Sequence, residues 1–145
     1  MIRSARRDAA AYKTRDGSLI RELMHPDVHG NRCQSLAEAK LRPGQTTLAH
    51  RHARTEEIYY ILKGEALMSV DHEKMPVGRG DAVLIPPGSW HCITNTGIGD
   101  LVWLCCCAPA YRHDDTQLLP PEGDETMSNT PSDGVHGDGS RGDRQ

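Results

Sequence analysis

The sequence predicts an all-β protein built as one small barrel. The chain has 145 residues, including 14 Gly and 9 Pro, and no stretch shows a long helical periodicity. Its apolar residues instead form short runs with β-branched and aromatic side chains, and Gly or Pro turns separate them. Without a polar C-terminal stretch, about 115 residues remain, which is enough for one barrel core.

The N-terminal part supplies a strand extension to this barrel. Residues 1–18 are a polar lead-in, and the barrel domain is expected over 19–115. Residues 18–24 alternate well enough for a strand, 25–31 read as a loop, and 34–39 read as another strand.

The next segment carries two histidines and a glutamate. In the run 44–52, His50 and His52 are two residues apart, so their side chains project from the same face of a strand. A four-residue turn then leads into a second strand at 57–63. Glu57 begins that strand and can turn back toward the two histidines.

A third histidine begins a later strand. After a hairpin at 67–77 and a short apolar strand at 82–85, the turn 86–89 leads into 90–94, where His91 stands near the start. The remaining apolar run, 101–108, predicts a buried strand. If these strands belong to one barrel, His91 can reach the other three side chains from across it.

Three imidazoles and one carboxylate suit a divalent transition metal. His50, His52, Glu57 and His91 would leave coordination positions open for water, O2 or a substrate, and the donor set fits Mn, Fe, Ni, Cu or Zn. One carboxylate on a divalent ion leaves a formal charge near +1. That charge favours an anionic chelating ligand such as an α-keto acid, a hydroxy acid, a catechol-like pair or an enediolate.

Both segments resemble the two motifs of the cupin family. The first motif has the spacing G-x5-H-x-H-x4-E-x6-G and the second G-x5-P-x-G-x2-H-x3-N. They are matched by Gly44, His50, His52, Glu57 and Gly64, and by Gly80, Pro86, Gly88, His91 and Asn95. The resemblance is to a small single-domain cupin of the RmlC-like superfamily and covers roughly residues 40–112. It implies a double-stranded β-helix barrel with these three histidines and Glu57 as metal ligands, but it implies no substrate.

Two adjacent carboxylates compete for the same role. Cupin spacing after the second histidine varies by one residue, so Glu56 is an alternative to Glu57. The six-residue interval between Glu57 and Gly64 favours Glu57. Glu56 is then expected to face solvent or to support a ligand indirectly.

Four further side chains are candidates for the pocket. Tyr59 should point the same way as Glu57 and serve either the core or the pocket, and Trp90 could form a pocket rim or pack outward. Cys105 and Cys107 share one face of their strand. They are either small apolar core residues in a reduced protein or thiols close to the metal.

Composition restricts the partners and the location. A net charge of -3 and a pI near 6.2 offer no basic surface for nucleic acid, and no apolar run approaches the roughly 20 residues that span a membrane. The basic N-terminus lacks an apolar stretch typical of a secretory signal, so a cytoplasmic location is predicted.

By analogy with small cupins we expect a homodimer, in which the strand at 19–24 could pair with a second subunit. The tail 116–145 is predicted to be disordered.

The expected function is metal-dependent chemistry on a small anionic or hydroxylated organic molecule. With Mn or Fe as the first expectation, the reaction would be of the oxygenase or decarboxylase type. Lewis-acid isomerisation or epimerisation of a sugar or sugar phosphate is the alternative, and binding of a small ligand without catalysis is a second one. The isomerase needs a general base, and the sequence identifies neither that base nor any other catalytic residue.

Overall fold

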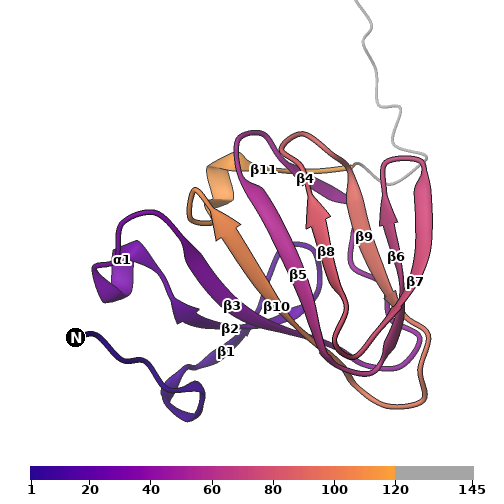
Figure 1. The fold of residues 1–145 in the computed structure, drawn as a ribbon, viewed down its shortest axis with the longest axis horizontal. Helices are drawn as coiled ribbons and strands as arrows, with labels where there is room; N and C mark the ends of the chain where they lie inside the picture. Colours follow the sequence, from indigo (N-terminus) through magenta and orange to yellow (C-terminus); the bar gives the residue numbers. More distant parts are fainter. Residues whose placement is uncertain (120–145) are drawn as a thin grey trace, which may run out of the picture.

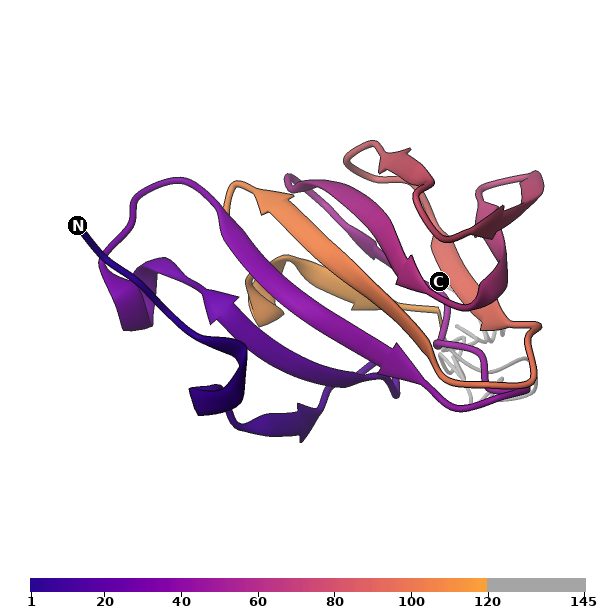
Figure 2. The same ribbon diagram turned by 60° about the horizontal axis from the view of Figure 1, so that its bottom comes forward.

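The computed structural model describes residues 1–119 and consists mainly of two antiparallel sheets that face each other (Figure 1). The first sheet has the order β1-β2-β3-β10-β5-β8 and the second the order β11-β4-β9-β6-β7. Figure 2 shows β1 and β2 continuing the first sheet beyond β3, away from the second sheet. The predicted all-β barrel with an N-terminal strand extension is confirmed.

The strands follow the predicted order along the chain. The first sheet contains β1 (Ala11–Lys13), β2 (Leu19–Met24), β3 (Ser35–Leu41), β10 (Leu101–Ala108), β5 (Glu56–Lys63) and β8 (Ala82–Ile85). The second contains β11 (Thr116–Leu118), β4 (His50–His52), β9 (His91–Asn95), β6 (Glu65–Val70) and β7 (Glu73–Gly78). Two 3-10 turns, η1 (Arg6–Asp8) and η2 (His113–Asp115), and the short helix α1 (Pro26–His29) complete the described elements.

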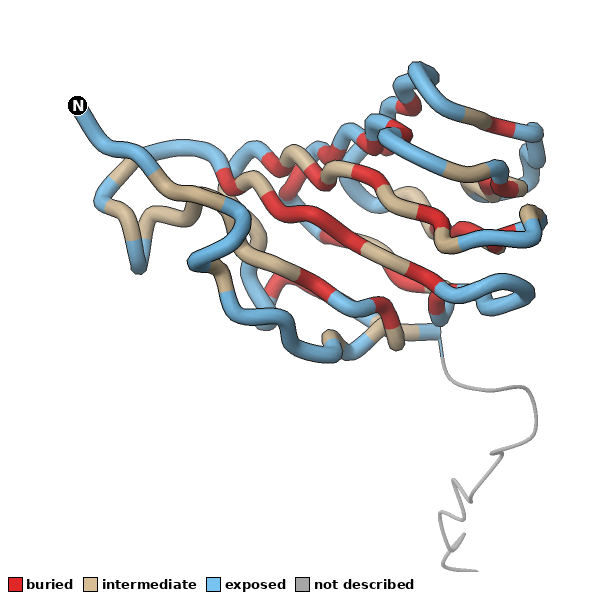
Figure 3. Tube along the Cα trace, turned by 90° about the horizontal axis from the view of Figure 1, so that it is seen from below, coloured by how far each residue is buried: buried red, intermediate tan, exposed pale blue. Residues whose placement is uncertain are grey.

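The core lies between the two sheets. Buried residues alternate with exposed ones along β5 and with partly buried ones along β9 and β10, so one face of each strand points inward (Figure 3). Trp103 and Ile61 are cross-strand partners in the first sheet, and both are fully buried together with Ile93 of the second. Full burial of such a side chain contributes about 1.5–3 kcal/mol to the stability of the fold. These apolar residues therefore stabilise the barrel that carries the polar site described below.

A glycine at the end of β5 is required by space as well as by conformation. Gly64 has a φ of 94°, and a Cβ there would lie 3.0 Å from the Leu101 Cα and 3.1 Å from the Asp100 carbonyl oxygen. Because both neighbours are backbone atoms, a side chain would force β5 and β10 apart. This agrees with the tight bend expected at Gly64.

Several local predictions need correction. The segment 25–31, expected to be a loop, contains α1, because the His25 ring accepts a hydrogen bond from the Asp27 N–H and Pro26 begins the helix. Within 44–52, expected to be extended throughout, only His50–His52 is a strand; Thr46 forms an isolated bridge to Thr94. The polar lead-in 1–18 holds β1, which pairs with β2.

The barrel also continues past residue 115, where the disordered tail was expected to begin. Thr116–Leu118 forms β11, which pairs with β4 so that Thr116 lies opposite His52 and Leu118 opposite His50. Alternation of a buried Thr116 with an exposed Gln117 gives this short strand an inward face. Residues 120–145 lie outside the described part, and their disorder stays a prediction.

Among the helices of residues 1–119, none has the length and apolar character needed to cross a membrane.

Candidate metal centre

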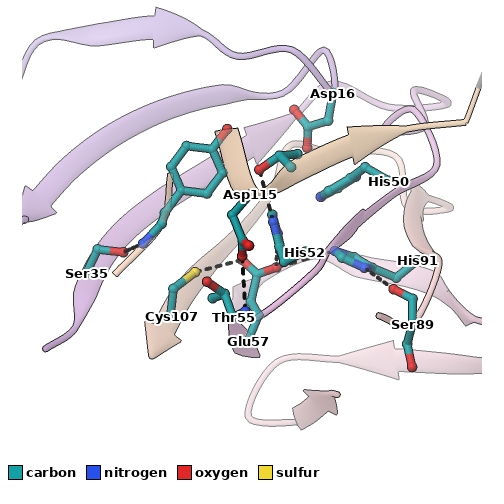
Figure 4. A network of polar contacts seen from close by, with 12 residues as sticks. Asp16, Ser35, His50, His52, Thr55, Glu57, Ser89, His91, Cys107 and Asp115 are labelled. Atoms are coloured by element: carbon teal, nitrogen blue, oxygen red, sulfur yellow. Dashed lines mark hydrogen bonds and ion pairs between the residues drawn. The ribbon is translucent and has the colours of Figure 1, made fainter. Parts of the chain in front are cut away.

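Four side chains from both sheets meet at one end of the barrel. His50 and His52 come from β4 and His91 from the neighbouring β9, where His50 and His91 are cross-strand partners. Glu57 reaches the same point from β5 of the opposite sheet (Figure 4). All four are buried, and one ligand atom from each lies within 4.8 Å of the others. The sequence prediction that these residues come together is therefore correct.

Backbone carbonyls orient two of the imidazoles. His50 Nδ1 lies 2.8 Å from the Leu48 carbonyl oxygen, and His91 Nδ1 lies 3.2 Å from the Ser89 carbonyl oxygen. A carbonyl oxygen only accepts, so each Nδ1 carries the proton and donates it. In the neutral rings, each Nε2 then presents a lone pair to the centre.

A hydroxyl group orients the third imidazole. The Thr116 hydroxyl donates to the Arg112 carbonyl oxygen at 2.9 Å, so at 3.0 Å it accepts the Nδ1 proton of His52. The His52 Nε2 therefore also turns its lone pair inward when the ring is neutral. This partner comes from β11, beyond the part of the chain that resembles the cupin motifs.

The facing nitrogens and the carboxylate oxygen are close enough to share a proton or a metal ion. Glu57 Oε2 lies 3.1 Å from His52 Nε2 and 3.3 Å from His91 Nε2, and the buried His91 Nε2 has no hydrogen-bond partner within residues 1–119. Lone pairs that face a carboxylate oxygen at these distances repel unless a proton or a metal lies between them. Donors bound at about 2.1 Å to one ion are at most about 4.2 Å apart, so a small contraction of the cluster would fit a single metal.

Charge and burial shift the pKa values of the centre in opposite ways. Burial alone would raise the pKa of Glu57, but the adjacent His52 and His91 outweigh it and hold that pKa below its ordinary value. Burial lowers the pKa of His50 to about 4, and the charge of His91 acts in the same direction. The Glu57 shift belongs to the metal-free protein, in which His52 and His91 face the carboxylate through Nε2–H groups. The His50 shift favours the neutral imidazole, which is the form that binds metal.

Comparison with known proteins identifies the scaffold. A model of the cupin domain matches residues 37–107. An uncharacterised protein from Methanocaldococcus jannaschii is 51% identical over 108 residues, which cover 74% of this chain and 86% of that protein. The oxalate-binding protein of Thermotoga maritima is 37% identical over 86 residues, which cover 59% of this chain and 67% of that protein. The chain belongs to the cupin family.

A solved structure of low sequence similarity has the same fold. The crystal structure of a predicted oxalate decarboxylase from Thermotoga maritima matches this cupin with a TM-score of 0.66 and 26% identity. The match covers 73% of this chain and 97% of the other. The cupin fold expected from the two motifs is thus confirmed.

A carboxylate from outside the family match holds the turn that connects two ligands of this cupin. Asp115 accepts hydrogen bonds from the backbone N–H groups of Arg54 and Thr55 at 3.2 and 3.1 Å, and from the Arg54 guanidinium at 3.0 Å. These contacts fix the turn between His52 and Glu57. The adjacent Glu56 is exposed, whereas Glu57 faces the histidines, so the spacing argument selected the correct carboxylate.

A cavity opens from the cupin centre toward the N-terminal strands. It is small, with about 50 Å³ open to the centres of water-sized molecules, and the centre contributes His50, His52 and Glu57 to its wall. The opposite wall comes largely from outside residues 37–107. Its residues there include Tyr12, Thr14, Arg15, Asp16, Tyr111 and Thr116.

The predicted pocket residues divide into three that line this cavity and one that does not. Tyr59 is both core and wall: it is buried against Trp103 and still borders the cavity, as do Cys105 and Cys107. Trp90 is not part of the wall; the Arg51 guanidinium lies over its ring at 4.7 Å. The Trp90 side chain therefore packs outside the site.

The two cysteines adopt the placement close to the ligands. Cys107 Sγ donates a hydrogen bond to Glu57 Oε1 at 3.4 Å, which leaves Oε2 directed at the imidazoles. Burial raises the pKa of both the Cys105 and the Cys107 thiol, with the Glu57 charge as the next cause. Both thiols are therefore neutral in this environment and serve as small wall residues.

Sequence reasoning missed the loop 14–18 and the two later wall residues. The polar lead-in predicted for residues 1–18 includes this loop, although Asp16-Gly17-Ser18 between two β-prone segments is typical of a turn. Tyr111 and Thr116 carry no comparable signal, because only the return of the chain to β4 places them at the centre.

Proposed function

We propose that this cupin holds one divalent transition metal per chain through His50, His52, Glu57 and His91 and acts on a small organic acid or hydroxylated molecule. The observation that carries the proposal is the convergence of three buried imidazoles, each with its Nδ1 held by an acceptor, and the buried carboxylate of Glu57. A bound ion would supply Lewis acidity at a ligand oxygen, and with Mn or Fe it would also supply redox chemistry.

The proposed ligand class follows from charge and from the cavity. A divalent ion and Glu57 carry a formal charge of +1 together, which favours a chelating carboxylate. The buried Tyr59 and Cys107 walls exclude water from one side of such a ligand, and the remaining wall offers the polar side chains of Thr14 and Arg15. Two similar proteins, an oxalate-binding protein and a predicted oxalate decarboxylase, support a small acid.

Oxygenase or decarboxylase chemistry on such an acid is the first proposal. Isomerisation of a hydroxylated carbonyl compound such as a sugar or sugar phosphate is the second candidate, because two carboxylates other than Glu57 lie in the cavity wall. They belong to Glu22, which accepts a hydrogen bond from Tyr12, and to Asp16. Binding without turnover is the third candidate, and the likeness to an oxalate-binding protein favours it.

Titration with oxalate tests the shared part of these candidates. Calorimetry should detect saturable binding of about one oxalate per chain to the Mn-loaded protein and none after the metal has been removed with a chelator. Oxalate binding that is unaffected by metal removal would contradict the proposal. Formate and CO2 would then be measured with and without O2, and saturable binding without either product would support the binding role.

We also propose that the chain forms a homodimer. Strand β2 already lies between β1 and β3, so pairing through its edge is largely blocked. The outer face of β5 and β8 instead exposes Ile58, Tyr60 and Leu84, with Ile58 and Leu84 as cross-strand partners. Light scattering at micromolar concentration should give twice the chain mass, and the mass of one chain would contradict the dimer.

A further inference from the structure

The loop between β1 and β2 places a carboxylate in the wall of the metal-centre cavity. Asp16 borders the same space as His50, His52 and Glu57, and Figure 4 shows it beside His50. The loop lies outside residues 37–107, which match the cupin domain. Asp16 therefore lies in a segment that flanks the matched cupin domain.

The backbone of this loop is fixed with respect to the centre. The Asp16 carbonyl oxygen accepts a hydrogen bond from the Leu48 N–H at 2.7 Å, two residues before His50. Within the loop, the Thr14 N–H donates to the Ser18 carbonyl oxygen at 3.0 Å, and the Ser18 residue is fully buried. The position of Asp16 relative to the ligands is thus determined by hydrogen bonds on both sides.

Only one of the two carboxylate oxygens of Asp16 is used by the fold. Oδ1 accepts hydrogen bonds from the N–H and the hydroxyl of Ser18 at 3.0 and 2.8 Å. Oδ2 has neither a hydrogen bond nor an ion pair within residues 1–119. The fold therefore holds the carboxylate by one oxygen and leaves the other available to a ligand.

The carboxylate also acts electrostatically on the cavity walls. The pKa of Tyr59 is well above its ordinary value, first because of burial and then because of Glu57, and Asp16 adds to the same shift. Burial likewise raises the pKa of Cys105, with Asp16 among the smaller causes. Asp16 borders the same cavity as these two residues and His50.

We propose that Asp16 is the general base of this site and that its substrates carry a C–H next to a carbonyl. The inference rests on the proposed metal-dependent function. With the carbonyl compound seated at the centre, Asp16 Oδ2 accepts the proton of the adjacent carbon. The C–H bond breaks and its electron pair moves to the carbonyl oxygen, which gives an enolate. Return of the proton from Asp16 to the same carbon exchanges the C–H. Where that carbon carries a hydroxyl, the hydroxyl proton passes to the former carbonyl oxygen, and return of the proton to the neighbouring carbon then shifts the carbonyl. Neither outcome consumes an oxidant or a reductant.

Asp16→Asn is the variant that isolates this role. Asparagine keeps one carbonyl oxygen for the Ser18 N–H, so the loop contact survives while the charge and the proton-accepting oxygen are lost. Asp81→Asn is the matched control. The Asp81 carboxylate also accepts a backbone hydrogen bond in a turn, from the Gly78 N–H at 2.7 Å, but it is exposed and does not line the cavity.

Two measurements test the proposal, because Asp16→Asn should slow proton exchange but strengthen oxalate binding. In the first, Mn-loaded protein is incubated with pyruvate in D2O, and deuterium in the recovered methyl group is measured by mass spectrometry against Mn²⁺ alone. Asp16→Asn should slow the exchange by about 100-fold or more. In the second, oxalate binding is measured by calorimetry. Asp16→Asn should strengthen it several-fold, because a negative charge near the dianion is removed.

The outcomes separate the base from a structural residue and from the proposed function. A structural role would weaken exchange and oxalate binding together and lower the metal content or the unfolding temperature. If Asp16→Asn exchanges the pyruvate methyl hydrogens at a rate within threefold of the wild-type rate, the proposal is overturned. A wild type that binds oxalate but exchanges no pyruvate would also overturn it, and that result would leave the proposed function intact. A wild type that does neither would contradict both.

Discussion

The metal ligands and the walls that face them come from two different regions of the chain. Residues 37–107, which match the cupin domain, supply His50, His52, Glu57 and His91. The flanking segments supply Asp16 and Tyr111 to the cavity, and they also hold the ligands through Thr116 and Asp115. The matched cupin domain thus supplies the four residues that could hold a metal, whereas the flanks supply part of the cavity wall and the contact that orients His52.

The largest effect is expected on metal affinity, when Glu57 of the scaffold region is replaced and its neighbour Glu56 serves as the control. Glu57→Gln removes the only negative charge among the four ligands and should weaken metal binding by at least about 100-fold. Glu56→Gln is the matched control, since that side chain is exposed one residue away. Competition with a fluorescent chelator measures both, and an equal loss in the two variants would contradict the ligand assignment.

Acidification tests the scaffold region without metal. The pKa of His50 is lowered to about 4 in the folded protein, against about 6.5 when unfolded, so the unfolded state binds more protons between these values. Stability of the metal-free protein should therefore fall as the pH drops from 6.5 to 4, by at most about 3 kcal/mol. The lowered pKa of Glu57 adds a further loss below about 4.5.

Urea unfolding at several pH values measures this loss. His50→Gln should flatten the dependence between pH 6.5 and 4.5, because the titrating group is absent. An unchanged slope in that variant would show that other groups cause the acid sensitivity.

Thr116→Val tests the support that the C-terminal flank gives to the scaffold. The substitution keeps the shape but removes the acceptor of the His52 Nδ1 proton, and metal affinity should fall by about 10–100-fold. Thr46→Val is the control, because its hydroxyl contacts only Thr94 on the surface. If both variants bind metal as the wild type does, the flank has no part in positioning His52.

A smaller effect is expected for Asp115→Asn. An amide has one acceptor oxygen where the carboxylate has two, so part of the hydrogen bonding to Arg54 and Thr55 is lost. The free energy of unfolding should fall by about 1–2 kcal/mol. Asp114→Asn, at the exposed neighbour that pairs with Arg112, should leave the unfolding midpoint unchanged. Similar midpoints for both variants would contradict a role for Asp115 in the turn.

The sequence predicted the scaffold region far better than the flanks, for a physical reason. His50, His52 and Glu57 lie within eight residues, so strand alternation and one turn determine how they meet, and the spacing around His91 is equally local. Thr116 reaches His52 across 64 positions, and Asp115 reaches Thr55 across 60. No local pattern encodes such contacts, which arise only when β11 pairs with β4.

Asp16 and Trp90 show that residues of the cavity wall are also hard to predict from local sequence. Trp90 was a candidate because it precedes a ligand in sequence, but alternation turns its side chain away, toward Arg51. Asp16 is far from every ligand in sequence, and its carbonyl contact with the Leu48 N–H brings it to the cavity. Nearness in sequence was therefore a poor guide to the walls, although it was a good one to the ligands.

Metal content tests the central claim most directly. Mass spectrometry would count the metal in purified wild type, in His91→Ala and in His72→Ala, a control whose histidine is exposed in the turn between β6 and β7. We expect about one divalent transition metal ion per chain in the wild type and the control, and little or none in His91→Ala. A wild type without metal after reconstitution, or a His91→Ala protein that retains it, would contradict the account.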